Sequence, residues 1–553
     1  MLCKCIIAEQ QCPLYKPVCL KYFINIRATG IVFTYHGGKT MSAQWLKDAV
    51  FYEIYPQSFY DTNGDGIGDL NGITEKLDYI KGLGCNALWI NPCFDSPFKD
   101  AGYDVRDYKK VAERYGTNED LYRLFRTAHQ KGMHVVLDLV AGHTSEEHEW
   151  FRESQKAEKN EFSDRYIWTN FCFEPADGLN YVAGESERSA AYVLNFFKCQ
   201  PALNYGFYRV NRPWQKPMEH PAAIATREAL KDVMRFWLSH GCDGFRVDMA
   251  ASLVKNDDDQ KTGTSAVWHD VRRMLELEFP DAVMISEWAD PPQALRAGFD
   301  IDFYLNNRYN GYSTLLRDYD DPEREDHSYF KKDAGGNINR FLDTYLRWYE
   351  DTKEIGYISL ITCNHDTRRP AYTLTEDELK LAYAFLFTMP GVPFLYYGDE
   401  IGMKYQEIPT KEGGYFRTGS RTPMQWDSNE NLGFSTGDKE DLYLPVDPSP
   451  DAPTVASQES DPSSLLHTVR EILALRGREK ELQADGAFSV ICSEPGRPFV
   501  YRRGDLILAV NPDSAEKSLP IAAGNRKIIY KIGKASLENG LLKLGTQSFT
   551  VLK

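Results

Sequence analysis

Short apolar runs alternate with amphipathic stretches along most of the chain. Helical spacing is clear at Glu119–Lys131, with Thr117 or Asn118 as the N-cap, and at Arg227–His240. Strands that alternate with helices predict an α/β fold with a parallel sheet, and eight such units close a (β/α)8 TIM barrel. The predicted strands are Val50–Tyr55, Ala87–Asn91, His134–Val140, Gly244–Asp248, Val283–Glu287, a segment near Asp300–Phe303, Ile358–Thr362 and Val392–Tyr397.

The barrel is predicted at residues 41–143 and 215–482, and the pattern changes outside these ranges. The connection after the third strand is far longer than an ordinary crossover, so residues 144–214 are expected to form a small inserted domain. Residues 436–462 are rich in Asp, Ser and Pro and indicate an exposed loop. The last barrel helix is predicted at Ser463–Leu482.

Short alternating strands follow at residues 483–553 and predict a C-terminal antiparallel β-sandwich. Examples are Phe499–Arg502, Leu506–Val510 and Arg526–Tyr530.

The first 40 residues do not share the periodicity of the rest. They hold four cysteines, and no signal peptide pattern appears. We interpret residues 1–40 as a non-native or disordered extension, and our hypothesis is that Met41 is the natural initiator. Mass spectrometry of the native N-terminus tests this, since a peptide from before Met41 would refute it.

The composition of the chain limits the classes of molecule that it is expected to bind. The chain has 553 residues and a net charge of −16 without an acidic tail, which argues against nucleic acid or an anionic membrane as a partner. Its 33 Tyr and 10 Trp suit a carbohydrate site, because sugar rings stack on aromatic faces, although large cores also use aromatics. Eleven cysteines without pairs at metal spacing indicate free thiols and a reducing, cytoplasmic compartment.

Three predicted strands have an acidic residue at or shortly after their C-terminal end. In Gly241–Ala250, apolar residues alternate with Arg246 and Asp248, which therefore point to one face of a strand. Taken alone, this also fits an exposed ion pair on an edge strand. Val283–Glu287 ends on a carboxylate and Ile358–Asp366 ends in His-Asp. Acids at strand ends suit barrel catalysis, and two carboxyls suit glycoside hydrolysis.

The motifs Gly-Phe-Arg-Val-Asp, Ile-Ser-Glu-Trp and Asn-His-Asp, in this order, resemble those of the α-amylase superfamily, glycoside hydrolase family 13. Within it the chain is most similar to the oligo-1,6-glucosidase and α-glucosidase branch. The likeness runs from about Trp45 to the C-terminus. It implies that Asp248 attacks the anomeric carbon as nucleophile, Glu287 is the acid/base, and Asp366 holds two sugar hydroxyls. This retaining route needs carboxyls about 5–5.5 Å apart.

Further binding residues follow from the resemblance. Arg246 would pair with Asp248 and keep it ionised, and His365 and His143 match histidines that donate to sugar hydroxyls. A lone histidine is more often structural, but each of these lies at a strand end inside a motif.

Asp100 and Tyr103 resemble the residues that grip the non-reducing glucose. Arg421 matches an arginine that pairs with the acid at the position of Asp100 and closes the pocket, although a surface salt bridge is the alternative. Gln200, in Gln-Pro-Ala-Leu-Asn, completes the expected substrate-binding set.

A metal is expected at one loop. Asp61, Asn63, Asp65 and Asp69, with the Ile67 carbonyl, place oxygens at the spacing that Ca²⁺ prefers. The resemblance implies structural Ca²⁺, for which Mg²⁺ can substitute. A metal-free Asp/Gly-rich turn is the alternative.

Three positions depart from the family pattern. Gly142 replaces the usual Asn before the strand-3 histidine, which makes the inter-domain Ca²⁺ of true α-amylases unexpected here. Ala202 stands where relatives usually carry Asp, and Met249 follows the nucleophile where Val or Ala is usual. The linkage preference is therefore left open.

These features together predict a monomeric or homodimeric exo-acting α-glucosidase that acts on short α-glucosides and needs no organic cofactor. Trehalose synthase, sucrose isomerase and transglucosidase activities are the alternatives with the same chemistry. A non-catalytic, partner-binding member is a remote third interpretation, since such proteins need a membrane span and tend to lose the catalytic acids.

Overall fold

The computed structural model describes residues 43–305, 310–318, 325–413, 417–522 and 524–553, and the backbone of one hairpin near the N-terminus. That hairpin pairs β1 (Ile24–Arg27) with β2 (Gly30–Phe33) in antiparallel register. The interpretation of residues 1–40 as a non-native or disordered extension otherwise falls outside the described residues. The hairpin belongs to a separate compact unit, Met1–Met41, while Ser42–Lys553 forms the other.

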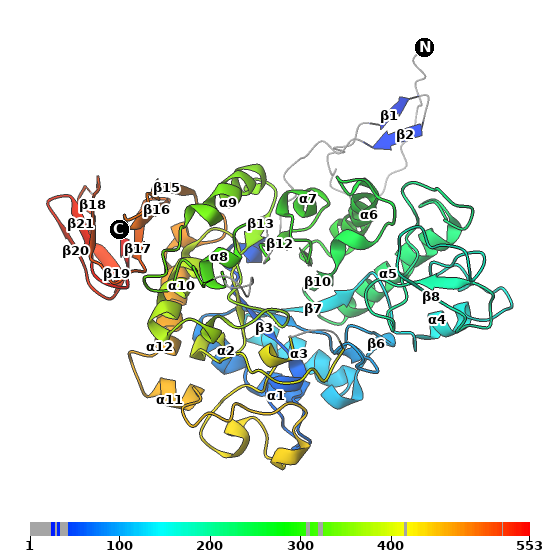
Figure 1. Ribbon diagram of the computed structural model, residues 1–553, viewed down its shortest axis with the longest axis horizontal. Helices are drawn as coiled ribbons and strands as arrows, with labels where there is room; N and C mark the ends of the chain where they lie inside the picture. The colour runs from blue at the N-terminus through cyan, green and yellow to red at the C-terminus, as the bar shows by residue number, and fades with distance from the viewer. Residues whose placement is uncertain are drawn as a thin grey trace, which may run out of the picture. The chain divides into compact units, whose positions relative to one another are not determined.

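Eight parallel strands form the barrel (Figure 1). In chain order they are β3 (Phe51–Ile54), β4 (Ala87–Ile90), β7 (His134–Val140), β10 (Gly244–Asp248), β11 (Val283–Ser286), β12 (Ile301–Phe303), β13 (Tyr357–Ser359) and β14 (Phe394–Tyr396). Each strand pairs with the next in chain order except β13 and β14, and β14 pairs with β3. A single bridge between Ile361 and Phe394 closes the remaining gap. The predicted strands are confirmed to within two residues at their starts and three at their ends.

The strands are apolar because both of their faces are covered. Nearly every strand residue is buried, as in the unbroken buried run of β10. Helices on the outside present amphipathic faces; α3 begins after Thr117, whose hydroxyl accepts from the Asp120 amide in a capping box.

The helices are α1 (Leu70–Glu75), α2 (Leu77–Leu83), α3 (Asn118–Gln130), α4 (Glu149–Ser154), α5 (Pro221–Ser239), α6 (Thr262–Glu278), α7 (Pro291–Arg296), α8 (Ser313–Leu316), α9 (Asn339–Thr352), α10 (Glu376–Thr388), α11 (Val455–Glu459) and α12 (Leu465–Arg478). One prediction is wrong in part: the segment expected as an exposed loop, residues 436–462, contains α11. Thr454 caps this short helix through the Ser457 amide, a local signal that the Asp, Ser and Pro content obscured.

Two long connections carry short strands that do not join the barrel. β5 (Phe94–Asp95) pairs with β6 (Asp107–Val111) after β4. Between β7 and β10, β8 (Tyr181–Ala183) pairs with β9 (Ala191–Val193). The second connection has a small core of its own, formed by Ile167, Ala176, Val193, Ala202, Phe207 and Trp214. It supplies residues to the pocket described below.

The C-terminal residues form two antiparallel sheets, as predicted. Figure 1 shows these strands, in red, beside α10 and α12. They share a core that includes Val500 and Ile507 from one sheet and Leu542 and Leu544 from the other. The five-stranded sheet contains β15 (Phe488–Cys492), β16 (Phe499–Arg503), β17 (Leu506–Asn511), β22 (Ser548–Leu552) and β19 (Ile528–Ile532), and the other β18 (Lys517–Pro520), β21 (Leu541–Leu544) and β20 (Ala535–Glu538).

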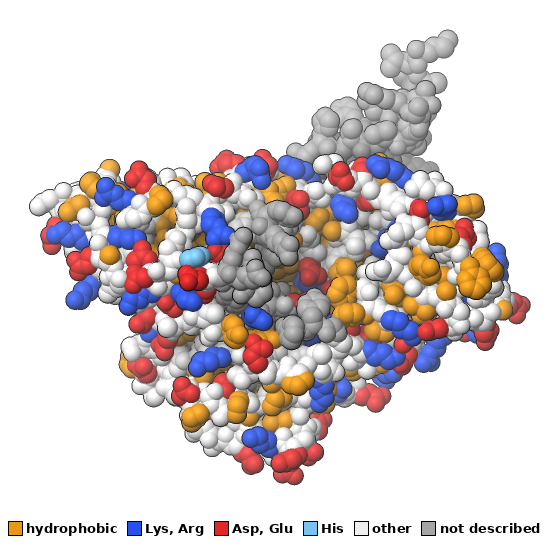
Figure 2. Space-filling view, in the orientation of Figure 1, with side chains coloured by type: hydrophobic (Ala, Val, Ile, Leu, Met, Phe, Trp, Pro, Cys, Tyr) orange, Lys and Arg blue, Asp and Glu red, His pale blue; other side chains and the backbone are white. Residues whose placement is uncertain are grey.

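The described residues include no helix that is both long and apolar enough to cross a bilayer. On the face that Figure 2 shows, basic and acidic side chains are interspersed and do not form one basic patch. This distribution gives no electrostatic footprint for nucleic acid on that face.

Candidate active site

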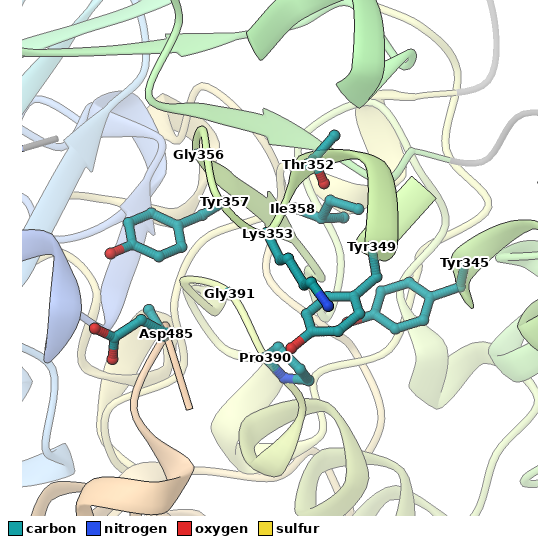
Figure 3. A pocket seen from close by; sticks show the side chains of 11 residues that line it. Tyr345, Tyr349, Thr352, Lys353, Gly356, Tyr357, Ile358, Pro390, Gly391 and Asp485 are labelled. Carbon is teal, nitrogen blue, oxygen red and sulfur yellow. The ribbon is translucent and has the colours of Figure 1, made fainter. Parts of the chain in front are cut away.

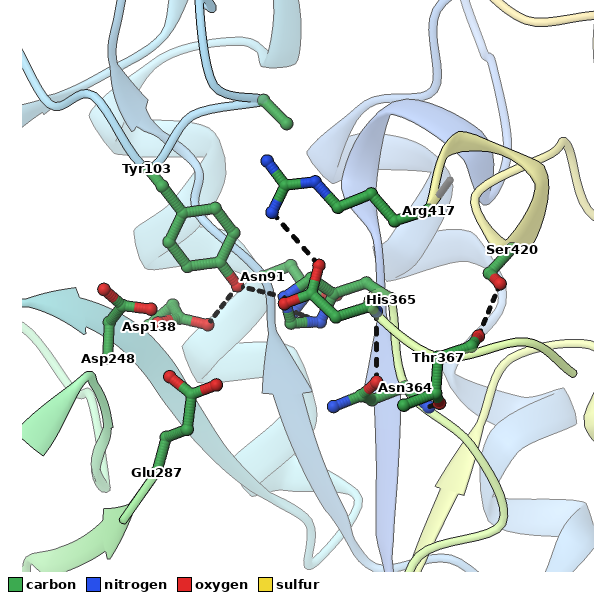
Figure 4. A network of polar contacts seen from close by, with 12 residues as sticks. Asn91, Tyr103, Asp138, Asp248, Glu287, Asn364, His365, Thr367, Arg417 and Ser420 are labelled. Carbon is green, nitrogen blue, oxygen red and sulfur yellow. Dashed lines mark hydrogen bonds and ion pairs between the residues drawn. The ribbon is translucent and has the colours of Figure 1, made fainter. Parts of the chain in front are cut away.

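A pocket of about 240 Å³ opens among residues that follow the carboxyl ends of the barrel strands. Asp248 ends β10, Glu287 follows β11 and Asp366 follows β13, so the three predicted catalytic acids meet there. Figure 4 shows two of them, Asp248 and Glu287, close together. The lining residues are Asp100, Tyr103, His143, Phe196, Gln200, Asp248, Met249, Glu287, Asp366 and Arg417. The other predicted binding residues, Arg246, His365 and Arg421, are each at most 1% exposed and lie in the layer that supports these acids.

Arg246 is the cation at the centre of this layer. Its guanidinium lies 2.9 Å from Asp138, 3.3 Å from Asp248 and 2.9 Å from Glu287. The side chain is buried, so the alternative of an exposed ion pair on an edge strand is wrong. The two-residue alternation in β10 explains the arrangement, because it points Arg246 and Asp248 to the inside of the barrel.

One guanidinium is the shared counter-charge of three carboxylates. Burial and the charge of Glu287 raise the pKa of Asp248 well above its usual range, although Arg246 opposes the shift. Burial also raises the pKa of Asp138, again against Arg246. The predicted contact between Arg246 and Asp248 is present, but the expectation that Arg246 keeps Asp248 ionised is wrong, because a cation shared among three carboxylates does not offset burial.

The backbone after β10 orients Glu287. Met249 has φ 44°, in the left-handed region that is strained for a residue with a side chain. This turn aims its N–H at Glu287, whose Oε2 accepts at 3.0 Å. Met249 also lines the pocket, so the residue that departs from the family pattern contacts both Glu287 and the cavity.

Asp366 has the opposite environment. Arg421 lies 2.7 Å and Arg417 3.2 Å from its Oδ1, and His365 Nε2 lies 3.3 Å from Oδ2. Burial alone would raise the pKa of Asp366, but these neighbouring groups, the two guanidinium ions among them, lower it below its usual range. These contacts favour the ionised form of Asp366, which suits a carboxylate that accepts from sugar hydroxyls.

The expected pairing of Arg421 with Asp100 is wrong. Arg417 forms the ion pair with Asp100, and Gln200 donates to the same carboxylate at 2.7 Å. Arg421 instead binds Asp366 and Glu412.

The turn at Thr418–Ser420 explains this exchange. It leaves Arg417 on the pocket side, where it lines the cavity, and sends Arg421 into the buried layer. The sequence shows two arginines four residues apart in one motif, but it does not indicate which of them pairs with Asp100.

His143 is held in a neutral form at the edge of the inserted segment. Its Nε2 donates to the Tyr103 carbonyl at 3.0 Å, and Asn195 lies 3.0 Å from its Nδ1. Burial lowers the pKa of His143 to about 4. Asn195 also explains Gly142, because a Cβ on that glycine would lie 2.7 Å from the Asn195 amide nitrogen. Lys255 contacts the same asparagine through its Nζ at 3.0 Å.

Glu53 and Asn91 contact the Nδ1 side of His365 and were not predicted from the sequence. Glu53 Oε1 lies 2.9 Å from His365 Nδ1, and Asn91 Nδ2 lies 3.2 Å from the same atom. The signal was a glutamate inside the otherwise apolar strand β3.

The predicted metal loop is closed by its own hydrogen bonds. Asp61 accepts from the amides of Asn63, Gly64 and Gly66 and from the Ser435 hydroxyl. These four bonds occupy the acceptor sites of the carboxylate. Asp69 accepts from Thr62 and Gly72, and Asp65 from Asn63 and Ile67.

No three acidic, histidine or cysteine side chains group as a metal site would require among the described residues. The spacing of the loop fits a cation, but the Asp61 carboxylate has no free acceptor site in this arrangement, so a bound cation would have to displace one of its donors.

A second and much smaller pocket, of about 20 Å³, lies near the starts of β13 and β14 and carries no comparable chemistry (Figure 3). Tyrosines dominate its wall, and Asp485 and Lys353 are its only charged residues among the described ones. The acids that could act on a glycosidic bond lie at the other end of the strands.

Comparison with known proteins agrees with this geometry. A family described as alpha amylase, catalytic domain, matches residues 53–485. An oligo-1,6-glucosidase from Parageobacillus thermoglucosidasius is 30% identical, covering 90% of this chain and 95% of its own. A trehalose synthase/amylase from Mycolicibacterium smegmatis is 34% identical, covering 78% and 76%.

Among solved structures, the trehalulose synthase MutB from Pseudomonas mesoacidophila superposes with a TM-score of 0.75 at 25% identity, over 93% of this chain and 100% of that one. The barrel, the acids at its strand ends and the extent of the family match lead to one conclusion: this chain belongs to the α-amylase family of glycoside hydrolases.

Proposed function

We propose that this protein is a retaining, exo-acting α-glucosidase that removes terminal glucose from short α-glucosides. The observation that carries the proposal is a pocket that holds Asp248 and Glu287 together and has the Asp100–Arg417 ion pair in its wall. Similarity to an oligo-1,6-glucosidase supports it. Malto- and isomalto-oligosaccharides and sucrose-like disaccharides are the proposed substrates.

The reaction uses two displacements. Glu287 gives its proton to the glycosidic oxygen while Asp248 attacks the anomeric carbon, so the bond to the leaving sugar breaks as a bond to Asp248 forms. Glu287, now ionised, takes a proton from water, and the water oxygen displaces Asp248 to release glucose with its configuration retained. Arg246 contacts both groups and stabilises the negative charge as it moves from one to the other.

A product time-course tests this function. Maltose, isomaltose, sucrose, trehalose and a short maltooligosaccharide are incubated with the wild type and with Asp248→Ala. Free glucose that appears with bond cleavage, and only in the wild type, supports the proposal and identifies the linkage. Internal cuts of the longest substrate alone would contradict exo action.

The second candidate is a glucosyl-transferring or isomerising enzyme. Similarity to a trehalose synthase/amylase and to a trehalulose synthase favours it. New disaccharides with little free glucose would select this alternative. A non-catalytic binding role is disfavoured because all three acids are present and line one pocket.

The ion pair between Asp100 and Arg417 gives a prediction about the end of the pocket that it closes. Arg417→Ala leaves Asp100 buried without its cation and opens the pocket, so kcat/KM on a disaccharide should fall about 100-fold, mainly through KM. Arg421→Ala, the matched control, removes the nearer of the two cations from Asp366 but leaves the ion pair of Asp100 intact, so it should lower kcat instead. Initial-rate kinetics on maltose and isomaltose separate the two. An equal rise in KM for both variants would contradict the assignment.

We also propose that the Asp61–Asp69 loop binds Ca²⁺, or Mg²⁺ in its place, on the basis of its spacing. The melting temperature should then rise by a few degrees when Ca²⁺ is added to EDTA-treated protein, because the ion binds only the folded loop. Asp65→Ala should abolish this response. An unchanged melting temperature in the wild type would leave the hydrogen-bonded turn as the whole function of the loop.

We further propose a cytoplasmic location and no organic cofactor. Free cysteines such as the buried Cys85 and Cys363 support a reducing compartment. Two carboxyls provide both the nucleophile and the proton, so the reaction needs no additional group. Cell fractionation tests the location, and full activity of dialysed protein tests the independence from a cofactor.

A further inference from the structure

One buried carboxyl under the pocket has no part in the two displacements. Glu53 lies in the middle of β3 and is fully buried. Its Oε1 lies 2.9 Å from Nδ1 of His365 and 3.2 Å from Nδ2 of Asn91. Its Oε2 is buried with no hydrogen-bond partner among the described residues. A carboxylate in such a place would be costly, so the position of its proton matters.

Hydrogen bonds on the other side of the imidazole give the direction of donation. Tyr103 Oη lies 3.1 Å from Asp138 and 2.6 Å from Nε2 of His365 (Figure 4). Asp138 is paired with the Arg246 guanidinium, so it is an acceptor. A phenol has one proton, and Tyr103 uses it on Asp138. His365 must therefore be the donor to Tyr103, with its proton on Nε2.

Asn91 lies beside the same contact. Its amide nitrogen lies 3.2 Å from both Glu53 Oε1 and His365 Nδ1. Its N–H donates to Glu53 Oε1, because the single lone pair of Nδ1 accepts from the Glu53 carboxyl.

A doubly protonated imidazole is excluded by its surroundings. Burial lowers the pKa of His365 well below its usual range, and Arg421, Arg246 and Arg417 lower it further although Asp366 opposes them. Burial raises the pKa of Glu53 well above its usual range. Asp138 adds to this rise, while Asn91, Arg246 and His365 oppose it. The proton between Glu53 and Nδ1 of His365 is therefore bonded to the Glu53 carboxyl.

We propose that Glu53 is a positioning residue that stays protonated, donates to Nδ1 of His365 and so fixes the tautomer with the proton on Nε2. Nε2 lies 3.3 Å from Oδ2 of Asp366. The Nε2 proton is donated to Tyr103 Oη, and this tautomer avoids a lone pair on Nε2 that would face the Asp366 carboxylate. A chain of donors then runs from Glu53 through His365 and Tyr103 to Asp138. Only the kinetic consequence of this assignment rests on the proposed function.

The tautomer can be measured without a substrate. In protein labelled with ¹⁵N-histidine, and with His365→Gln used to assign the signal, we expect a pyridine-type nitrogen at Nδ1 and a proton on Nε2. Glu53→Gln should preserve this signature, since its amide N–H can also donate to Nδ1. A proton on Nδ1 in the wild type would overturn the proposal, whatever substrate the enzyme uses.

Kinetics give a second readout. Glu53→Met has no donor, and we expect kcat on the best disaccharide to fall about 100-fold with a smaller change in KM. Glu53→Gln should recover kcat to within about threefold of the wild type, because it restores a neutral donor of the same length. Equal losses in two variants that melt like the wild type would overturn the donor role. If Glu53→Met does not fold, the Gln variant and the tautomer measurement still decide.

Discussion

Glucose release should fall by at least about 10⁴-fold when Asp248 is replaced by glycine. The reason is geometric: Asp248 ends β10 inside the pocket, and no other described carboxylate occupies that strand end. Glu287 and Asp366 remain, but one is the proton donor and the other is held by Arg421. Initial rates on an aryl α-glucoside with a good leaving group measure the loss, because this substrate does not need Glu287 for its first step.

Azide rescue distinguishes the nucleophile from the acid/base. In Asp248→Gly a small anion can fill the space of the lost carboxylate and displace the aryl group once, giving β-glucosyl azide. In Glu287→Ala, the matched control, Asp248 still forms the intermediate and azide attacks second, giving α-glucosyl azide. The same anomer from both variants would contradict the assigned roles.

Removing the shared cation should have the second largest effect. Arg246→Met leaves Asp138, Asp248 and Glu287 together without a counter-charge. Loss of one partner from a buried ion cluster lowers the free energy of unfolding by about 3–5 kcal/mol. Arg246→Lys retains a charge but not the fork that reaches three carboxylates, so it should show a smaller loss. Denaturant unfolding measures both variants.

The loss should grow with pH. Asp248 and Asp138 have raised pKa values in the folded protein, so the native state binds more protons than the unfolded chain above the ordinary carboxyl range. The free energy of unfolding therefore falls as pH rises through this window. Without Arg246 the shifts enlarge, so Arg246→Met should lose less at pH 5 than at pH 8. A loss independent of pH would show that Arg246 acts by packing alone.

Much of the framework could be predicted because it depends on local pattern. The alternation of Arg246 and Asp248 in β10 placed both on the inner face, and strand ends brought Glu287 and Asp366 to the same pocket. The two N-cap candidates named for α3, Thr117 and Asn118, likewise included the observed cap, Thr117.

Pairings between distant segments could not be predicted from such patterns. The turn at Thr418–Ser420 decides that Arg417, not Arg421, meets Asp100, and single-residue spacing does not encode that turn. Glu53 is a similar case. It lies more than 300 residues before His365, so only the closed barrel brings the two together. The pKa of Asp248 also depends on how many acids share one cation, which the sequence does not state.

The covalent intermediate offers the most direct test of the central claim, that Asp248 is the nucleophile of a retaining α-glucosidase. The wild type is treated with 5-fluoro-α-D-glucosyl fluoride, digested at low pH and analysed by mass spectrometry. The account predicts one added fluoroglucosyl group, located on Asp248 in the peptide that contains β10, and none in Asp248→Asn. A label on any other residue, or turnover of the reagent by the Asp248→Asn variant at the wild-type rate, would contradict it.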